Sequence, residues 1–348
     1  MLKNTLEEKT KEKKCLILID SNAIIHRAFH ALPILTNKKK EVVNAVYGFL
    51  LIFLRVIKDF KPEYVVAVFD FPAKTFRHQK YRLYKANRPK TPDDLCSQIL
   101  KIKEILEKFN ISIFEKKGYE ADDIIGTISK IIPRKQIFPK IETIILTGDL
   151  DLLQLVNENT KSYTLRRGVK DAILYDEKQV KEKYQGLLPE QLADFRGLRG
   201  DPSDNIPGVF GIGEKTAISL IKDFGSVENI YQELNKNTEK SKTIKAVLRE
   251  KLLNHKDNAF VSKMLADINC EVPIDFDLEK TKWGKYDKKE VIEILNEYGF
   301  KTLVVRLLEF YNENNNENNN ENNNENNNEN NNENNNEKSE VKSNLKLW

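Results

Sequence analysis

Cysteine is scarce in this sequence of 348 residues, and its three copies, Cys15, Cys96 and Cys270, lie far apart. No Cys-x-x-Cys pair is present. An odd number of separated cysteines without an apolar leader predicts a reducing compartment and no disulfide framework. Residues 1–14 are mostly Lys, Glu and Thr and lack the apolar centre of an export signal. These absences argue against a disulfide-stapled secreted scaffold, and we expect a cytoplasmic protein.

Long apolar runs are also lacking. The longest apolar stretch, near residues 46–57, contains Arg55 and predicts a buried amphipathic helix, because a membrane span needs about 20 consecutive apolar residues. The hydrophobic content of 40% and charged content of 32% are typical of a soluble globular protein. The length allows one large domain or two. We therefore expect a soluble protein with no membrane partner.

The net charge of the chain is the sum of a basic main part and an acidic tail. The formal value is +4, but residues 312–337 repeat Glu-Asn-Asn-Asn with seven glutamates and residues 338–348 contribute +2, so residues 1–311 carry +9. A basic surface around an acidic pocket suits a polyanion that is held by its backbone. Charge alone does not separate this interpretation from lysines that only provide solubility.

Apolar runs alternate with helical patterns as far as about residue 200. Strands are predicted at residues 15–20, 64–70, 111–114 and 143–147, and helices at residues 42–60, 92–109, 121–132 and 151–156. This alternation predicts an α/β fold with a mostly parallel sheet and helices on both of its faces. After about Asp201 the strand patterns stop, and short helices are predicted as far as Tyr311.

The composition divides the chain into four regions. We predict a disordered N-terminus (1–13), an α/β core (14–200), a helical region (201–311) and a disordered Asn/Glu-rich tail (312–348). Glutamate at every fourth position of the tail could instead line one face of a helix, but three asparagines in each turn make a poor helix.

Three of the apolar runs end on an aspartate: Asp20, Asp70 and Asp149. The carboxyl ends of parallel strands meet at one edge of a sheet, and ligands gather there. Three carboxylates at one edge repel each other unless a cation lies among them. The pattern therefore indicates a metal site.

A second group of acids, Glu120, Asp122 and Asp123, opens the helix predicted from residue 121. Acids in a first helical turn are also favourable partners of the helix dipole. That alternative accounts for one or two carboxylates, but not for three that directly follow a Gly118-Tyr119 turn.

Two acidic pairs complete the set. Asp149 and Asp151 are two residues apart at a strand end, so both can face the same edge of the sheet. Asp201 and Asp204 lie in a turn-forming loop, and that segment taken alone also fits ordinary turn chemistry.

The candidate metal ligands are all carboxylates: Asp20, Asp70, Glu120, Asp122, Asp123, Asp149, Asp151, Asp201 and Asp204. An all-oxygen set favours Mg²⁺ or Mn²⁺ over zinc. Because one Mg²⁺ needs only one or two carboxylates, so many predict at least two ions, about 4 Å apart as in sites that cleave phosphodiesters. The histidines are expected to be packed or surface residues: His26, His30, His78 and His255.

Several short segments stand in a characteristic order: Leu18-Ile19-Asp20, Arg27-Ala28-Phe29-His30-Ala31-Leu32, Ala45-Val46-Tyr47-Gly48-Phe49, Phe76-Arg77-His78, Tyr84-Lys85-Ala86-Asn87-Arg88, Gly118-Tyr119-Glu120-Ala121-Asp122-Asp123, and Gly200 through Gly213. In order and spacing they resemble the 5′→3′ exonuclease domain of bacterial DNA polymerase I, which belongs to the flap endonuclease superfamily. The resemblance covers about residues 15 to 310.

The resemblance implies a PIN-like α/β nuclease core followed by a helical region that contains a helix–hairpin–helix. It implies a two-metal hydrolase that cuts 5′ flaps and 5′ ends of duplex DNA or RNA primers and leaves a 5′-phosphate. By the same resemblance, Asp70, Glu120 and Asp122 would hold the first ion, supported through water by Asp20 and Asp123. The second ion would be held by Asp149, Asp151 and Asp204, with Asp201 close by.

The segment of about residues 72–92 is basic and aromatic, with Arg77, Lys80, Tyr81, Arg82 and Tyr84 as candidate DNA contacts. Taken alone it also fits a solvated basic helix whose aromatic side chains face the core. The resemblance implies an arch that a single strand enters, for which stacking rings and phosphate-binding cations are suited. Lys85 and Arg88 would then stabilise charge that develops on the scissile phosphate.

The segment from Gly208 to Ala217 matches a helix–hairpin–helix. Glycines allow backbone N–H groups to approach a phosphate at the start of the next helix. Its candidate DNA contacts are Gly208, Gly211, Gly213, Lys215 and Thr216. The resemblance also implies a potassium ion at this hairpin.

Three functions remain in view: a structure-selective 5′ nuclease in primer removal and repair, a non-catalytic DNA-binding protein of the same fold, and a PIN-type ribonuclease. A binding-only relative would have lost carboxylates, and a ribonuclease gives the arch and hairpin segments no role. We expect a monomer in the bacterial cytoplasm, with a DNA polymerase acting in trans as a candidate partner. Whether the chain is a stand-alone nuclease or part of a polymerase stays open.

Overall fold

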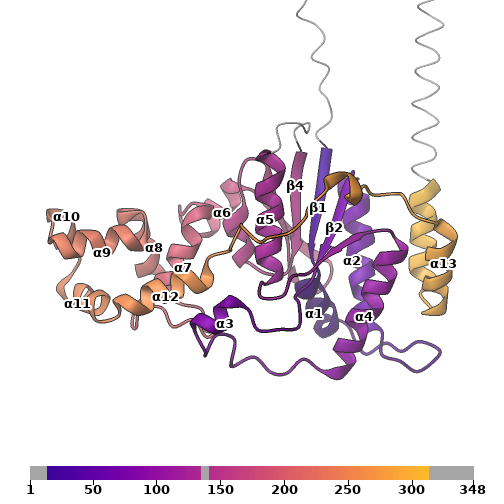
Figure 1. Ribbon diagram of the computed structural model, residues 1–348, viewed down its shortest axis with the longest axis horizontal. Helices are drawn as coiled ribbons and strands as arrows, with labels where there is room; N and C mark the ends of the chain where they lie inside the picture. Colours follow the sequence, from indigo (N-terminus) through magenta and orange to yellow (C-terminus); the bar gives the residue numbers. More distant parts are fainter. Residues whose placement is uncertain (1–13, 135–140, 313–348) are drawn as a thin grey trace, which may run out of the picture. The chain divides into compact units, whose positions relative to one another are not determined.

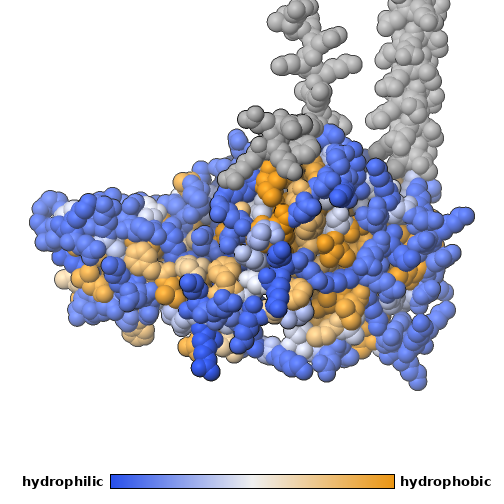
Figure 2. Space-filling model, viewed as in Figure 1, coloured by the Kyte–Doolittle hydropathy of each residue, from blue (hydrophilic) through white to orange (hydrophobic). Residues whose placement is uncertain are grey.

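The computed structural model describes residues 14–134 and 141–312 (Figure 1). The disorder predicted for residues 1–13 and for the Asn/Glu-rich tail lies outside the described residues, apart from position 312. Among the described residues, no helix is both long enough and apolar enough to cross a membrane. Hydrophilic residues cover most of the face shown in Figure 2.

A six-stranded mixed sheet forms the centre of the chain, with the order β3-β2-β1-β4-β5-β6. Its strands are β1 (Lys14–Asp20), β2 (Tyr64–Val68), β3 (Ser112–Phe114), β4 (Ile141–Thr147), β5 (Thr160–Arg167) and β6 (Asp171–Tyr175). The pairs from β3 to β5 are parallel, and β6 pairs antiparallel with β5. The predicted α/β fold with a mostly parallel sheet is confirmed.

The central strands form because their apolar side chains are buried on both faces. Leu16 and Leu18 of β1 pack in one cluster with Ile124 and Ile128 of α5 (Ala121–Arg134). Since successive side chains of a strand point to opposite faces, the fully buried Ile17 faces the other side of the sheet. There α1 (Ser21–Ala31) contacts β1, β2 and β4, and it packs with α2 (Asn44–Phe60) and α4 (Asp93–Lys108).

The four predicted strands are all present, but the predicted set of elements was incomplete. Strands β5 and β6 and helix α1 were not predicted, and residues 151–155 form the 3₁₀ helix η1 (Asp151–Leu155) rather than an α-helix. In the predicted arch only α3 (Phe76–Lys80) is helical, and residues 82–87 form turns.

The rest of the chain is helical, and residues between positions 180 and 259 contribute to a second apolar cluster, which includes Leu198, Val209 and Ile221. Its elements are α6 (Glu177–Lys183), η2 (Pro189–Gln191), α7 (Leu192–Arg199), α8 (Glu214–Phe224), α9 (Val227–Lys236), α10 (Glu239–Lys242), α11 (Ala246–Asn254), α12 (Lys256–Ala266), η3 (Leu278–Thr281) and α13 (Lys288–Glu297).

After α12 the chain returns to the sheet. Lys282 forms a bridge with Tyr64 of β2, and the Trp283 N–H donates to the Glu63 carbonyl at 2.9 Å. Residues up to Val291 form one compact unit, and a second unit begins at Ile292. Within the second unit, residues 301–312 are helical. A domain boundary near residue 200 stays a prediction.

Candidate metal centre and nucleic-acid interface

Acidic side chains from three strand ends and one helix start line a single cavity of about 310 Å³. They are Asp20 after β1, Asp70 after β2, Asp149 after β4, and Glu120 and Asp122 at the start of α5. The parallel register of β2, β1 and β4 aligns the carboxyl ends of these strands. The sheet topology therefore assembles residues that are distant in sequence.

Burial and mutual repulsion make this cavity costly for charged carboxylates. Burial, together with the charges of the neighbouring Asp70 and Asp149, raises the pKa of Asp20 to about 7, against the hydrogen bond from Thr147. The Thr147 hydroxyl donates to Asp20 at 2.6 Å, and the Ala23 N–H donates to it at 3.2 Å. Part of the negative charge has therefore to be neutralised.

The helix-start carboxylate Asp122 is also in an unfavourable environment for a negative charge. Burial raises its pKa well above the ordinary value, and the charges of Asp20 and Asp149 add to this. Although Asp70 as a residue is exposed, desolvation of its carboxylate in the cavity raises its pKa, against the hydrogen bond that the carboxylate accepts from the Ala121 N–H at 2.8 Å. A cation that entered the cavity would be stabilised by each of these groups.

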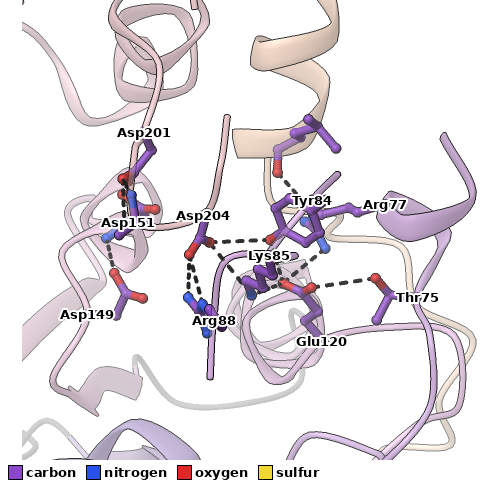
Figure 3. Close-up of polar contacts among 12 residues, drawn as sticks. Thr75, Arg77, Tyr84, Lys85, Arg88, Glu120, Asp149, Asp151, Asp201 and Asp204 are labelled. Atoms are coloured by element: carbon purple, nitrogen blue, oxygen red, sulfur yellow. Dashed lines mark hydrogen bonds and ion pairs between the residues drawn. The ribbon is translucent and has the colours of Figure 1, made fainter. Parts of the chain in front are cut away.

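Two arch cations lie against the carboxylates (Figure 3). The Lys85 ammonium is 3.0 Å from Glu120 and 3.7 Å from Asp204, and the Arg88 guanidinium also pairs with Asp204. Although burial opposes it, the charges of Lys85 and Arg77 keep the pKa of Glu120 below its usual range. The cations thus supply part of the missing positive charge.

The backbone fixes the arch cations over the cavity. Lys85 has a positive φ of 54°, a strained conformation for a lysine, and its N–H donates to the Asp204 carbonyl at 2.9 Å. Asn205 donates to the Leu83 carbonyl at 2.7 Å, and Asn87 to the Pro202 carbonyl at 2.8 Å. The loop that carries Asp204 and the arch limb therefore form one bonded unit.

A second acidic group surrounds Arg196 of α7. Its guanidinium donates twice to Asp151, at 3.0 and 2.7 Å, and lies 3.1 Å from Asp201. Burial and the charge of Asp149 raise the pKa of Asp151 to about 6, against the charge of Arg196. A small cavity joins Asp149, Asp151 and Asp204, whereas Asp201 lines a separate cleft with Arg196.

Two predicted site residues are sequestered in a buried ion pair. Arg77 donates to both carboxylate oxygens of Asp123, at 2.8 and 2.7 Å, and their residues are 2% and 0% exposed. Arg77 also donates to the carbonyls of Leu265 and Asp267, at 2.9 and 2.8 Å. This pair ties the base of the arch to α5 and to the end of α12.

The remaining arch residues differ in exposure. Lys80 and Arg82 are exposed and Tyr81 is half-buried, which fits a nucleic-acid surface. Tyr84 is buried, and its hydroxyl donates to Glu120 at 3.1 Å. Tyr84 therefore contacts the acidic site from inside the protein, and its ring is not available to stack on a DNA base.

The hairpin between α7 and α8 is built on glycines that approach other backbone closely. Gly208 has a φ of 64°, and a Cβ there would lie 2.4 Å from the Gly200 nitrogen. Gly213 precedes α8 and has open space beside it. Lys215 is exposed and Thr216 half-buried, both in the first turn of α8. Backbone N–H groups at this helix start remain approachable by a phosphate.

The donor set suits hard divalent cations, although the carboxylates stand apart from one another. Within residues 14–134 and 141–312, no three Asp, Glu, His or Cys side chains converge closely enough to hold an ion. Repulsion among the carboxylates and their pairs with Lys85, Arg88 and Arg196 account for this spread. The all-oxygen chemistry fits Mg²⁺ or Mn²⁺.

Several residues of the site were not identified from the sequence. Asn22 and His26 line the main cavity, and burial lowers the pKa of His26. Asn22 accepts the Asp70 N–H at 3.0 Å, and Thr147 and Arg196 orient acidic side chains. Only the position of Asn22, two residues after a strand-end aspartate, gave a signal in the sequence.

The fold is shared with solved nucleases. T5 5′-exonuclease with bound divalent metal ions (zinc) matches 84% of this chain and 96% of that chain, with 19% identity and a TM-score of 0.58. The catalytic core of Rad2 in complex with DNA substrate matches 86% of this chain and 93% of that chain, with 20% identity and a TM-score of 0.55. The fold is thus that of the flap nuclease class.

Sequence comparisons give the family. The N-terminal resolvase-like domain of 5′-3′ exonucleases matches residues 15–185, and their C-terminal SAM fold matches residues 187–289. The chain belongs to the 5′-3′ exonuclease family and is a nuclease of that family.

Curated relatives are DNA polymerases I. That of Bacillus subtilis (strain 168) is 43% identical over 298 residues, which are 86% of this chain and 33% of that protein. That of Caldicellulosiruptor bescii is 42% identical over 296 residues, 84% of this chain and 33% of that protein. The chain therefore spans about a third of the length of the curated relatives it matches.

Proposed function

We propose that this chain is a 5′→3′ exonuclease and 5′-flap endonuclease that uses divalent ions to hydrolyse phosphodiester bonds of DNA and of RNA primers. The observation that carries the proposal is the pairing of Lys85 and Arg88 with an acidic cavity. Cations on a neighbouring arch can move from carboxylates to a phosphate once other cations occupy the carboxylates.

Two groups of carboxylates are suited to two ions. We assign Asp70, Glu120 and Asp122 to the first ion, with Asp20 nearby, because all of them line the main cavity. The smaller cavity is also lined by Glu120 and Asp122, but Asp151 and Asp204 line it and not the main cavity. We therefore assign Asp151 and Asp204 to the second ion, together with Asp149, which lines both cavities. Asp201 acts through Arg196, and the buried Asp123 is left out of the set.

The metal is Mg²⁺, with Mn²⁺ as a substitute. When bound, two such ions activate a water and stabilise the attacking and leaving oxygens of an in-line displacement. The chain's own residues then bind and orient the substrate. Lys85 and Arg88 donate to the scissile phosphate, and the exposed Lys80 and Arg82 hold the incoming strand.

The hairpin holds the duplex part of the substrate. The N–H groups of Val209 and Ile212 are bonded within the protein, so the N–H groups at the start of α8, after Gly213, bind phosphates of one strand together with Lys215. The hairpin that contains Gly208 and Gly211 would hold a potassium ion in the bound state. Phosphate contacts of this kind fix position without reading sequence. The selectivity is thus for structure: a duplex at the hairpin and a free 5′ end at the arch.

Primer removal and repair in the cytoplasm of a bacterial cell fit this substrate. We propose that the nuclease acts as a monomer and that a DNA polymerase, in cis or in trans, produces the flap. The matched relatives carry the name DNA polymerase I, which supports this setting.

The test is cleavage of a 5′-flap DNA substrate with Mg²⁺ and with EDTA. We expect one cut near the junction, with a 5′-phosphate on the product, in Mg²⁺ alone. Binding to the flap without cutting in both Mg²⁺ and Mn²⁺ would instead support a non-catalytic DNA-binding protein. Preferential cutting of single-stranded RNA would support a PIN-type ribonuclease.

A further inference from the structure

We propose that Phe210, at the tip of the hairpin, packs against base edges and sugars in the minor groove of the bound duplex and partly unstacks one base step. The inference rests on the proposed function, because it assigns an additional contact to the same duplex-binding hairpin. Phosphate contacts position the duplex, and Phe210 adds an apolar contact to its interior.

The exposure of Phe210 is unusual among the aromatic residues that the structure describes. Its residue is 77% exposed. Among the phenylalanine, tyrosine and tryptophan residues that the structure describes, it alone is classed as exposed. An exposed aromatic ring lacks the stabilisation that burial would give it, and together with the anchored turn that carries it, this exposure indicates a contact made in another state.

The hairpin holds this ring rigidly in place. Val209 and Ile212, on either side of the tip, are 2% and 5% exposed and belong to the helical core. The Val209 N–H donates to the Leu198 carbonyl at 2.8 Å, and the Ile212 N–H donates to the Val209 carbonyl at 3.0 Å. Phe210 thus projects from an anchored turn, so its binding costs little ordering of the backbone.

The base of the hairpin is anchored from a second side. The Gly208 N–H donates to the Ser262 hydroxyl at 2.8 Å, inside the molecule. Gly211 has a φ of 76°, which favours glycine, and directs the chain back toward α8. The turn therefore presents one side chain outward, and that side chain is apolar.

The surroundings of Phe210 are cationic and fit a polyanion. The Lys251 ammonium lies 3.4 Å from the Gly211 carbonyl, and the His255 ring centroid lies 6.1 Å from that of Phe210. Lys215 is exposed in the first turn of α8. A protein partner would favour a broader apolar patch, whereas one ring among cations suits a nucleic acid.

Minor-groove proteins use apolar side chains in this way. A phenylalanine placed against or between base pairs partly unstacks them and bends the duplex. Contacts between aromatic rings and bases tolerate any sequence, because every base has a π-face. Phe210 would therefore favour duplexes that bend easily at the hairpin, in keeping with a nicked or flapped junction.

The experiment measures binding of the whole chain, in EDTA, to a duplex that carries 2-aminopurine at successive positions. The fluorescence of 2-aminopurine rises when the base is unstacked. We expect a rise at one or two adjacent positions, and Phe210→Ala should abolish it and weaken binding about tenfold. Phe210→Tyr should restore both. Leu100→Ala, at another exposed apolar residue, is the matched control and should change neither.

Three outcomes overturn the inference. Equal affinity and equal fluorescence for Phe210→Ala and the unchanged chain would leave Phe210 without a DNA contact. A change in sedimentation alone would assign the ring to a second copy of the chain. Absence of duplex binding by the unchanged chain would overturn the inference together with the proposed function. If the unchanged chain cleaves the flap in Mg²⁺ but Phe210→Ala changes neither affinity nor fluorescence, the inference alone is overturned.

Discussion

The ammonium of Lys85 lies 3.0 Å from Glu120 and 3.7 Å from Asp204, so one arch cation bridges carboxylates assigned to two different ions. The charges of Glu120 and Asp204 hold the pKa of Lys85 well above its usual value, although burial opposes this. The ammonium therefore stays protonated near neutral pH. Under the proposed function, Lys85 competes with incoming divalent ions and contacts a phosphate after they bind.

Removal of Lys85 has opposite effects on metal binding and on catalysis. In Lys85→Ala we expect about a hundredfold slower flap cleavage, because a donor to the developing charge is lost. Mn²⁺ should bind about fivefold to tenfold more tightly, because a charge-assisted pair worth about 1–1.5 kcal/mol no longer competes. Cleavage of a labelled flap and Mn²⁺ titration followed by electron paramagnetic resonance measure the two effects.

The control for this prediction is Lys90→Ala. Lys90 also belongs to the arch segment, but its side chain is 89% exposed and pairs with Asp93, away from the cavity. The Lys90→Ala variant should bind Mn²⁺ with unchanged affinity. Weaker Mn²⁺ binding by Lys85→Ala would show that the ammonium does not compete for the carboxylates.

Arg77 and Arg82 lie in the same basic segment and should respond differently to substitution. Arg77→Met leaves the buried Asp123 without its partner and should lower the free energy of unfolding by about 3–5 kcal/mol. Arg82→Met, at an exposed position, should leave stability unchanged and reduce the salt dependence of DNA binding by about one phosphate contact. Urea unfolding and binding at several salt concentrations separate the two roles. A normal unfolding curve for Arg77→Met would contradict the assignment of a structural ion pair.

Without metal, the stability of the chain should fall as the pH rises. Burial raises the pKa of Asp20 to about 7 and that of Asp151 to about 6. Their unfolded values are near 4, so between about pH 4 and pH 7 the folded chain binds protons that the unfolded chain has released. Stability therefore decreases through this window, by about 1.4 kcal/mol per pH unit for each such group, and levels off above it.

Thermal unfolding in EDTA measures this dependence. Between pH 5.5 and pH 8 the carboxylates with a lowered pKa, Glu120 and Asp201, are already ionised and contribute little to the slope. Burial lowers the pKa of His26 and His78, so below about pH 6.5 these two histidines oppose part of the fall. We expect a lower melting temperature at pH 8 than at pH 5.5, a larger gain from Mg²⁺ at pH 8, and a flatter profile for Asp20→Asn. A melting temperature in EDTA that rises over this interval would contradict the repulsion described for the cavity.

The parts predicted well from the sequence are those with a local pattern. The unbroken apolar runs of β1, β2 and β4 show buried strands, and an aspartate at each end shows where the sheet gathers charge. Strand β5 has the sequence Thr160–Arg167, in which polar and apolar residues mix. It was missed because its burial depends on the neighbouring strand and not on its own composition.

Partners that lie far apart in sequence could not be assigned in advance. Arg77 and Asp123 are 46 residues apart, and nothing local distinguishes this arginine from the exposed Arg82. Arg196 is one of many cations of a basic chain, and only the fold brings it to Asp151. The carboxylates could be identified as a set because repulsion requires a common explanation. Of the cations that balance them, Lys85 and Arg88 were named only through the resemblance, and Arg196 was not named.

The central claim is that divalent ions held by the carboxylates of the cavity act on a DNA phosphate. The most direct test measures Mg²⁺-dependent cleavage of a 5′-flap substrate by the unchanged chain and by the variants Asp122→Asn and Asp149→Asn. The control variant is Asp93→Asn, which changes an exposed carboxylate. We predict that cleavage by the two cavity variants is slower by about a thousandfold or more, which corresponds to about 4 kcal/mol of lost transition-state stabilisation. Both variants should still bind the flap, and the control should cleave at the rate of the unchanged chain. Cleavage by both cavity variants at the rate of the unchanged chain would contradict the account.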